Sequence, residues 1–361
     1  MPEHSSIRDP HPEHAAPRFS PPRVLHIAHQ QLRRYGATRV SWARKLDLGL
    51  VRAGFDLHIF SDRDVAAFEA PFGIRALGER RAQQRLLEMA EAVEPDLVIV
   101  GHCDSITNAT LQTLRVPRPE LRMIHCNNDP LFVPSNAARI AHRAEVCDAV
   151  IVSTGRTTLK ERFPELAGRV FHMPNPVDPT IERYDGSTRS NQSTDLIFCS
   201  KSENFTDRLS LVSSLRTAVA DELRFRTPGA FGEPGVWGLD YDRALADSRM
   251  GLNINRQEGD YWYSSARMAQ LGGNGLLVFT HGDNGFQQLF PAETLVYFND
   301  AASLISAVRQ FHNDDAMRRT WAERTRRFFH DELNSTRYAR YIAETGLGVP
   351  YSEDYVWLHN D

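Results

Sequence analysis

The feature that most constrains this chain is an alternation, from Arg23 onward, of short apolar runs with longer segments of helical periodicity. Such an alternation is typical of βαβ units, in which helices connect the parallel strands of one sheet. The first half predicts about six strands, at 24–28, 55–60, 96–100, 122–125, 149–153 and 170–173. The helices predicted between them are 38–53, 80–93, 106–115, 135–145 and 155–163.

A second set of alternating runs follows a polar stretch after Met173, which reads PNPVDPTIERYDGSTRSNQSTD. Because this stretch is rich in Pro, Ser, Thr, Asn and Asp and lacks an apolar period, it predicts an interdomain connection. The length of 361 residues also exceeds that of one ordinary core. Beyond the connection we expect strands at 196–200, 251–255, 275–279 and 294–298, helices at 207–220, 240–247 and 264–271, and only helices after 301.

The predicted fold class is therefore α/β, with two doubly wound, Rossmann-like domains that face each other across a cleft and helices at the C-terminal end. Ligands of such domains bind at the carboxyl ends of the strands, so the candidate site lies in the cleft. No fixed-period repeat is visible, which argues against a solenoid.

Composition excludes several classes of protein. Hydrophobic residues at 41% and charged residues at 24% are typical of a soluble globular chain, and no apolar run approaches the ~20 residues of a membrane span. A net charge of -4 gives no general attraction for nucleic acid, so we expect no nucleic-acid partner. The four cysteines form no CxxC pair and the N-terminus lacks an apolar signal core, so we expect a cytoplasmic protein, with peripheral contact at the inner face of a membrane left open.

Several common catalytic motifs are absent from the sequence. It contains no GxGxxG after the first strand, no GxxxxGKS/T, no HExxH and no GxSxG, which argues against the commonest dehydrogenases, P-loop NTPases, metalloproteases and α/β-hydrolases. Asp-x-Asp spacings at Asp62/Asp64 and Asp240/Asp242 can hold a metal with a diphosphate, but both also read as solvated charges. We expect no metal site and no cofactor.

The most informative segment runs from a predicted strand at 251–255 into a helix that opens at Ser264 and Ser265. Backbone N–H groups and hydroxyls at a helix N-terminus form a ready anion site, and Arg267 can reach a phosphate from the first turn. The alternative is an ordinary serine cap followed by an exposed arginine. Trp262 and Tyr263 either stack on a base or sugar, or simply pack.

The second half resembles the C-terminal half of GT-B glycosyltransferases, most closely the spore-maturation-type (CgeB-like) branch. The resemblance is carried by GVWGLDYDRALADSRMGLNIN, YSSARMAQLGGNGLLVFT, GFQQLF and the helical tail from LVYFNDAASLI onward. In the first half, VLHIAH, MIHCNNDPLF, CDAVIVST and VFHMPNPVD resemble the strands and linker of such enzymes. Most of residues 195–345 follow the pattern.

The resemblance implies a division of the chain and a donor-binding half. The expected parts are 1–21, a disordered tail; 22–175, an acceptor-side domain; 176–194, a linker; 195–332, a nucleotide-sugar-binding domain; and 333–361, a helix and tail that pack back on the first domain. The sequence departs from the retaining family that carries two glutamates eight positions apart. Glu258 or Asp260 is the nearest counterpart of the first, and Met268 or Ala269 stands in place of the second.

The resemblance also implies how the charge on a departing diphosphate is stabilised. GT-B enzymes stabilise this charge with basic side chains and helix N-termini. Lys201 and Arg208 occupy the positions of the family's basic pair, although both can equally be surface charges at a helix start. The remaining donor-binding candidates are Ser264, Ser265, Arg267, Glu258, Asn255 and Gly36, whose lack of a side chain allows close backbone approach.

The acceptor-side domain is expected to supply the base. Asp129 and His125 follow the fourth strand, so Asp129 can accept the proton of an acceptor hydroxyl and His125 can bond the acceptor or the sugar. The alternative is a turn at Asp129-Pro130 and a half-buried structural histidine. Arg33 and Arg34 can contact an anionic acceptor. A basic helical face, Arg318, Arg319, Arg324, Arg326 and Arg327, either rests on anionic lipid or is solvated.

The function implied is transfer of a sugar from a nucleoside diphosphate sugar to a hydroxyl of a glycan, a lipid-linked acceptor or a small molecule, without a metal. The alternative is a non-catalytic GT-B-like binding or assembly partner in envelope or coat glycan synthesis. An epimerase acting on a nucleotide sugar is a third reading.

Overall fold

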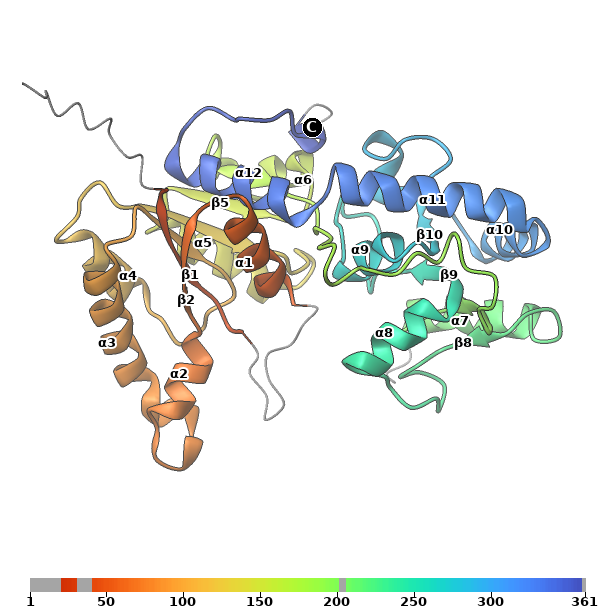
Figure 1. The fold of residues 1–361 in the computed structure, drawn as a ribbon, viewed down its shortest axis with the longest axis horizontal. Coiled ribbons are helices and arrows are strands. Elements are labelled where there is room, and N and C mark those ends of the chain that lie inside the picture. The colour runs from red at the N-terminus through yellow and green to blue at the C-terminus, as the bar shows by residue number, and fades with distance from the viewer. Residues whose placement is uncertain (1–20, 31–40, 201–205, 359–361) are drawn as a thin grey trace, which may run out of the picture.

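The computed structural model describes residues 21–30, 41–200 and 206–358. Two parallel sheets with flanking helices follow one another along the chain (Figure 1). The predicted α/β class with two Rossmann-like units is confirmed. Residues 1–20 of the predicted tail lie outside the described part.

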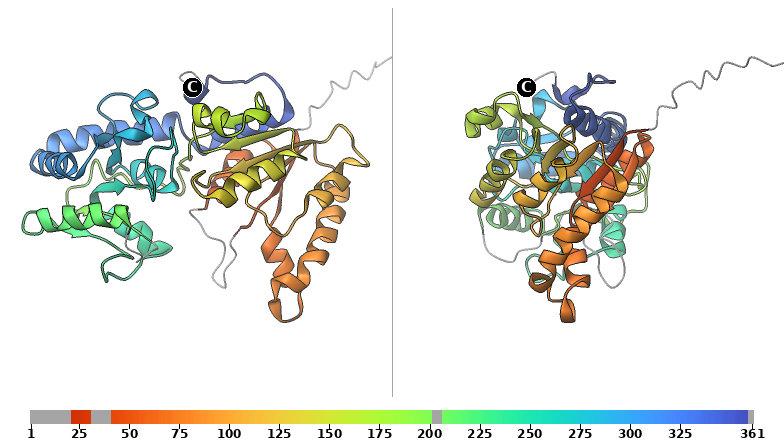
Figure 2. Two further views of the ribbon diagram at one scale, coloured as in Figure 1. Left: turned by 180° about the vertical axis from the view of Figure 1, so that it is seen from behind. Right: turned by 90° about the vertical axis from the view of Figure 1, so that its left-hand side faces the viewer.

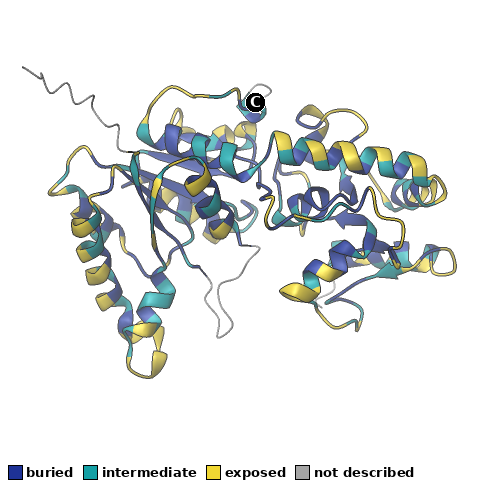
Figure 3. Ribbon diagram, in the orientation of Figure 1, coloured by how far each residue is buried: buried dark blue, intermediate teal, exposed yellow. Residues whose placement is uncertain are grey.

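The first sheet has six parallel strands in the order β2-β1-β3-β4-β5-β6, which confirms the six strands predicted from the sequence. Its central strands are apolar and buried on both faces, because helices cover both sides of a parallel sheet (Figure 3). The strands are β1 (Arg23–Ile27), β2 (Asp56–Phe60), β3 (Leu97–Val100), β4 (Arg122–Asn127), β5 (Ala149–Val152) and β6 (Val170–His172). The helices are α1 (Trp42–Arg52), α2 (Asp62–Phe68), α3 (Arg75–Val93), α4 (Asn108–Arg115), α5 (Pro134–Ala144) and α6 (Arg156–Arg162).

The second sheet has five parallel strands in the order β11-β10-β9-β7-β8. Its two-residue strand β8 is too short for a periodic pattern and was not predicted from the sequence. The strands are β7 (Thr194–Ile197), β8 (Phe225–Arg226), β9 (Ser248–Asn253), β10 (Leu277–His281) and β11 (Val296–Phe298). The helices are α7 (Asp207–Ala218), α8 (Leu239–Ala246), α9 (Ala266–Gly273), α10 (Ala301–Asn313) and α11 (Asp315–Asp331).

Helices α2 and α3 form a hairpin that the sequence predicted only in part, from residue 80 onward. The charged start of α2 reads as a solvated loop, but Asp62 is fully buried and accepts a hydrogen bond from the backbone N–H of Ser105 at 3.0 Å. Asp62 and Asp64 also favour a helix start because they face its positive end. The hairpin projects from the body of the first domain (Figure 2).

The last long helix, α12 (Ser335–Leu347), returns to the first sheet and packs against α1, β3 and β4. Gly49 of α1 lets the helices approach closely, since a Cβ there would stand 2.0 Å from the carbonyl oxygen of Ser335. The connection between the domains runs beside this return crossing. The backbone N–H of Val177 donates to the carbonyl of Leu333 at 3.0 Å, and that of Ser335 donates to Val177 at 2.8 Å.

A buried ion pair also fixes the connection to the first domain. Lys45 of α1 lies 2.7 Å from Glu182, and both side chains are at most 3% exposed. The Lys45 ammonium donates a second bond, of 2.9 Å, to the carbonyl of Pro176. The pair therefore holds α1 against two points of the interdomain connection.

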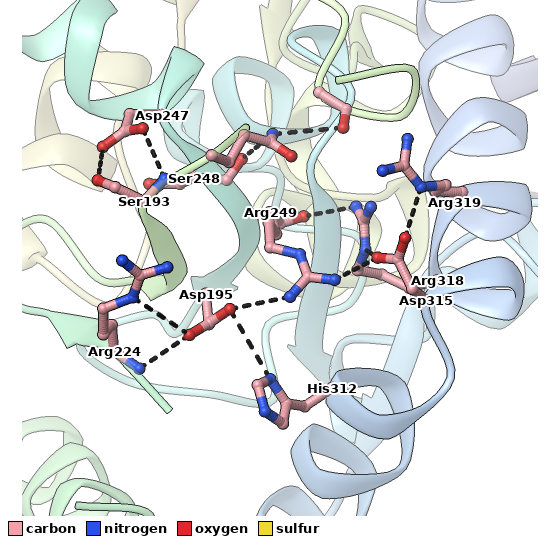
Figure 4. A network of polar contacts seen from close by, with 12 residues as sticks. Ser193, Asp195, Arg224, Asp247, Ser248, Arg249, His312, Asp315, Arg318 and Arg319 are labelled. Atoms are coloured by element: carbon pink, nitrogen blue, oxygen red, sulfur yellow. Dashed lines mark hydrogen bonds and ion pairs between the residues drawn. The ribbon is translucent and has the colours of Figure 1, made fainter. Parts of the chain in front are cut away.

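A network of ion pairs joins β7, β9 and α11 in the second domain (Figure 4). Arg249 binds Asp195 at 2.9 Å and also pairs with Asp315, which accepts a bond from Arg318 at 2.8 Å. Arg318 is fully buried, and Arg319 bonds the same carboxylate at 2.6 Å. These two arginines of the predicted basic face are therefore engaged in ion pairs within the protein.

Candidate functional site

The first crevice lies where the strand order of the first sheet reverses. β1 stands between β2 and β3, so the connections that leave the adjacent strands β1 and β3 run in opposite directions, to β2 and to β4, at the carboxyl ends of the strands. A cavity of about 360 Å³ opens there. Its lining residues are Ala28, His29, Ser41, Trp42, Ala43, Arg63, His102, Asn128 and Asp129.

A histidine and a carboxylate meet in this cavity. Nδ1 of His102 lies 3.3 Å from an Asp129 oxygen, and the two side chains are 40% and 35% exposed. Arg139 contacts the same carboxylate at 3.3 Å. The hydrogen bond with His102, with added attraction to Arg139, holds the pKa of Asp129 below its usual range although partial burial opposes this. Asp129 is thus ionised at neutral pH. Its backbone N–H also donates to Asn127 Oδ1 at 2.8 Å, a bond that fits the turn proposed from the sequence at Asp129-Pro130.

His125 lies deeper, on β4, and does not line the cavity. Its side chain is 1% exposed, and Nδ1 donates to the carbonyl of Val100 at 2.8 Å. Burial lowers the pKa of His125 to about 3, so the imidazole is neutral. The structure therefore places His125 as a buried histidine that orders β3 against β4.

The second crevice occupies the equivalent place in the second sheet. β7 stands between β8 and β9, so the chain diverges at the carboxyl ends of β7 and β9. The guanidinium groups of Arg208 and Arg267 lie 5.6 and 5.3 Å from the centre of the Phe198 ring, which follows β7. Arg256, which follows β9, lies 5.6 Å from the ring of Phe132 in the first domain.

The charges of Arg267 and Arg256 act on Arg208. Burial, followed by the charges of Arg267 and Arg256, lowers the pKa of Arg208 to about 10, and Glu258 opposes this only in part. Among the described residues, the buried Nε of Arg208 has no hydrogen-bond partner. Burial also lowers the pKa of Arg267, whose guanidinium donates one bond of 2.9 Å to the carbonyl of Ile254. A site of this kind favours an anion that carries more than one charge.

The two crevices meet at an interdomain contact. The rings of Phe132 and Tyr263 pack edge to face at 6.3 Å, and the backbone N–H of Ser264 donates to the carbonyl of Ser153 at 3.1 Å. Burial raises the pKa of Tyr263, and the nearby Asp129 charge raises it further while Arg267 and Arg256 oppose it. The His102–Asp129 pair therefore borders the same interdomain region as Arg208, Arg256 and Arg267, which we call the arginine cluster.

The serines at the start of α9 differ from the expectation that their hydroxyls are presented to an anion. Ser264 is fully buried, and its Oγ accepts a bond from the backbone N–H of Asn175 at 3.3 Å. Ser265 is the N-cap residue, yet its Oγ donates to Asn253 Oδ1 at 2.7 Å and does not cap the helix. The Ser264 hydroxyl therefore bonds the segment that follows the first sheet, whereas the Ser265 hydroxyl bonds β9 within the second domain.

Glu258 and Asn255 build the loop that leads from β9 to α9. Glu258 accepts bonds from the backbone N–H of Asn255 at 2.7 Å, from the Asn255 amide at 3.2 Å and from the Asn284 amide at 2.8 Å. Three donors thus fix this carboxylate beside the arginine cluster. Trp262 is fully buried in a left-handed conformation (φ 52°) and donates to the carbonyl of Gly285, so it packs and does not stack on a ligand.

Two donor-binding candidates, Lys201 and Gly36, lie outside the described residues, as do Arg33 and Arg34. The sequence did not single out His102, Arg256, Phe132 or Phe198. A signal for His102 existed, since it follows an apolar strand as Asp129 does, but its pairing with Asp129 depends on the order of β3 and β4. Among the residues that the structure describes, no three His, Cys, Asp or Glu side chains gather as a metal site. No helix in the same part of the chain is long and apolar enough to cross a membrane.

Comparisons with known proteins bear on the family and on the fold of this chain. Residues 208–344, less than half of the chain, match a family model described as "Glycosyl transferase-like". The matched region contains Arg208, Arg256 and Arg267. No curated protein sequence matches the chain.

Similar solved structures cover nearly the whole chain at low identity. Sucrose-phosphate synthase from Thermosynechococcus elongatus is 12% identical, with a TM-score of 0.62 over 90% of this chain and 98% of that chain. Anabaena HepE in complex with UDP and glucose is 12% identical, with a TM-score of 0.56 over 90% and 99%. A putative UDP-N-acetylglucosamine 2-epimerase from Listeria monocytogenes is 14% identical, with a TM-score of 0.54 over 93% and 100%. The chain therefore has the GT-B fold, which transferases share with such epimerases.

Proposed function

We propose that the protein is a glycosyltransferase that moves a sugar from a nucleoside diphosphate sugar to an acceptor hydroxyl. The observation that carries this proposal is the placement of Arg208, Arg256 and Arg267 across the domain junction from His102 and Asp129. The family model over residues 208–344 supports it independently. Anabaena HepE, with the same fold, was solved with UDP and glucose, which favours a nucleotide-sugar donor.

The transfer forms a bond between the anomeric carbon and the acceptor oxygen and breaks the bond between that carbon and the diphosphate oxygen. The leaving diphosphate gains negative charge, which the arginine cluster stabilises through charge-assisted hydrogen bonds. Because fixed cations supply this stabilisation, the proposed reaction is metal-independent. Lys201, a neighbour of the cluster in sequence, is proposed as a further donor ligand.

The acceptor hydroxyl releases a proton during the transfer. In the proposed mechanism, Nε2 of His102 accepts this proton, while Asp129 bonds Nδ1 and keeps the imidazole oriented. Asp129 is a weak base by itself, because His102 and Arg139 lower its pKa. The cavity of about 360 Å³ that these residues line is the proposed acceptor site. Membership of the spore-maturation-type branch is part of this proposal.

Thermal shift with UDP, GDP, ADP, CMP and dTDP, each with and without EDTA, tests the donor site, because a ligand of the folded state raises its apparent stability. We expect a selective shift with one diphosphate that survives EDTA. Arg208→Gln removes the shift, whereas Arg216→Gln keeps it. Arg216 is a matched control because it lies on the same helix and also stacks on a phenylalanine, Phe231, at 4.7 Å.

Turnover separates the remaining alternatives. Release of the diphosphate with a donor sugar and an acceptor supports a transferase, and isomerisation of the sugar with the nucleotide still attached identifies an epimerase. Selective binding of a diphosphate without any turnover identifies a non-catalytic binding partner. Absence of any shift overturns the arginine cluster as a donor site.

A further inference from the structure

The hairpin of α2 and α3 ends in a protruding tip. The short helical turn Pro71–Gly73 joins the two helices there, and both views of Figure 2 show the hairpin reaching beyond the rest of the first domain. Since α2 follows β2 directly, the hairpin starts beside the cavity, which Arg63 of α2 lines. The tip, at the opposite end of the hairpin, lies away from that cavity.

The tip exposes large apolar side chains. Phe68 is 76% exposed, Phe72 99%, Ile74 52% and Leu77 61%. These four lie within ten consecutive residues, whereas the described part of the chain has eleven exposed large hydrophobic residues in all. Single exposed apolar residues are normal on a protein surface, but a contiguous group of them marks an interaction site.

The backbone of Phe72 adds a second observation. Its φ is 59° and ψ is 15°, a left-handed conformation that is disfavoured for a bulky side chain, and Gly73 follows with a φ of 71°. The local structure thus keeps an aromatic ring in solvent at the expense of backbone strain. Strained residues of this kind gather at functional surfaces.

The hairpin below the tip is tightly packed, so the tip is preformed. A Cβ on Gly78 of α3 would stand 1.8 Å from the carbonyl oxygen of Ala66 on α2, which means that the backbones of the two helices touch. Arg85 also bonds Glu69 across the hairpin at 2.8 Å. A rigid, preformed tip loses little conformational entropy when it binds.

The tip carries positive charge in a chain of net charge -4. Residues 68–85 contain four arginines and two glutamates, and all four arginines are exposed. Arg75 pairs with Glu79, and Arg81 and Arg85 pair with Glu69. Leu77 shares the outward face of α3 with Arg80 and Arg81, which stand three and four positions further along the helix. Exposed apolar groups flanked by arginines match an anionic lipid surface, in which rings enter the acyl boundary while guanidinium groups remain among the headgroups.

We propose that the α2–α3 tip docks the protein on an anionic lipid bilayer by inserting Phe68, Phe72, Ile74 and Leu77. A second copy of the chain fits the tip less well, because a symmetric contact would bring the same arginines together. The inference does not depend on glycosyl transfer.

The test is co-sedimentation of the full-length protein with vesicles of phosphatidylcholine alone and with vesicles that also contain phosphatidylglycerol. We expect binding to the anionic vesicles, weakened by salt. Phe72→Asn tests the tip without unfolding it, since asparagine tolerates the left-handed conformation. Its melting temperature should equal or exceed that of the wild type, while vesicle binding falls about tenfold or more.

Two further variants complete the design. Arg80→Gln with Arg81→Gln should lower binding to anionic vesicles only, whereas Val116→Ser, which changes a residue 78% exposed elsewhere, should leave binding intact. Equal binding by wild type and Phe72→Asn overturns the proposal, as does no binding to anionic vesicles. If light scattering shows that the wild type self-associates and that Phe72→Asn does not, the partner of the tip is a second copy of the chain, and the bilayer proposal is overturned. The diphosphate thermal shift serves as an independent readout, so failure of docking and failure of the proposed function are distinguishable.

Discussion

Arg208 and Arg267 stand over the same phenyl ring, at 5.6 and 5.3 Å from the centre of Phe198. The ring supplies attraction to each cation, but it does not neutralise either. The apo protein therefore holds like charges close together at the end of β7, where a bound anion would relieve their repulsion.

Removal of one of these charges should have opposite effects on binding and on stability. Arg208→Gln should weaken binding of the preferred diphosphate by about 10- to 100-fold, because a charge-assisted hydrogen bond is lost. The free protein should become more stable by up to roughly 1 kcal/mol, since solvent screens part of the repulsion. Titration calorimetry and urea denaturation measure the two quantities. A variant that binds normally and is less stable would show that Arg208 is only structural.

Substitution of His102 and Asp129 should separate catalysis from donor binding. We expect His102→Gln to lower kcat by about 10²- to 10⁴-fold and Asp129→Asn by a smaller factor, because the second change leaves the imidazole in place. The KM for the donor should stay near the wild-type value in both, as the donor binds across the junction. His142→Gln is a control, since His142 also lies beside a carboxylate, Glu145, at 3.5 Å. Unchanged turnover in His102→Gln would remove it from the mechanism.

The ion-pair network predicts a dependence of stability on pH. Burial acts to raise the pKa of Asp315, but hydrogen bonds from Arg319, Arg249 and Arg318 outweigh it, and the net shift is downward. A carboxyl with a lowered pKa in the folded state contributes stability above its unfolded pKa of about 3.9 and loses it as the pH falls further. Asp315→Asn should therefore cost about 1–2 kcal/mol at pH 7, because Arg318 is left buried without its anion while solvent screens the Asp315 side chain, which is 40% exposed.

Denaturation at several pH values tests the predicted loss of the Asp315 contribution to stability as the pH falls. The difference between wild type and Asp315→Asn should shrink progressively below about pH 4. A difference that is constant across this range would mean that Asp315 acts by packing and not by charge.

The pair of Lys45 and Glu182 offers a test of the interdomain connection. Lys45→Met should destabilise the protein by about 3–5 kcal/mol, because Glu182 is left charged and 1% exposed. The double variant Lys45→Met with Glu182→Leu should recover much of the loss, since apolar residues can replace a buried pair. Guanidinium denaturation of the single and double variants measures the coupling. Additive losses would contradict a direct ion pair.

The sequence predicted the strands well because buried parallel strands are continuous apolar runs, such as Leu97–Val100. Arg267 was named as a candidate from its position in the first turn of a helix, and Arg208 from the resemblance to the basic pair of GT-B glycosyltransferases. His102 was not, because its partner Asp129 follows the neighbouring strand and only the pairing of β3 with β4 brings the two together. The bonds that the hydroxyls of Ser264 and Ser265 make within the chain were not predicted, because their partners, Asn175 and Asn253, come from distant or preceding segments that a local pattern does not include.

The return of α12 to the first sheet has a consequence for how the chain is assembled during synthesis. A Cβ on Gly346 would stand 2.7 Å from a methyl of Leu97, so the last helix closes tightly on strands made some 250 residues earlier. The ribosome therefore releases the whole second domain before the first can bury that face of its sheet. Until then the apolar surface under α12 stays open to chaperones and to mispairing, and completion of the fold waits for the last helix.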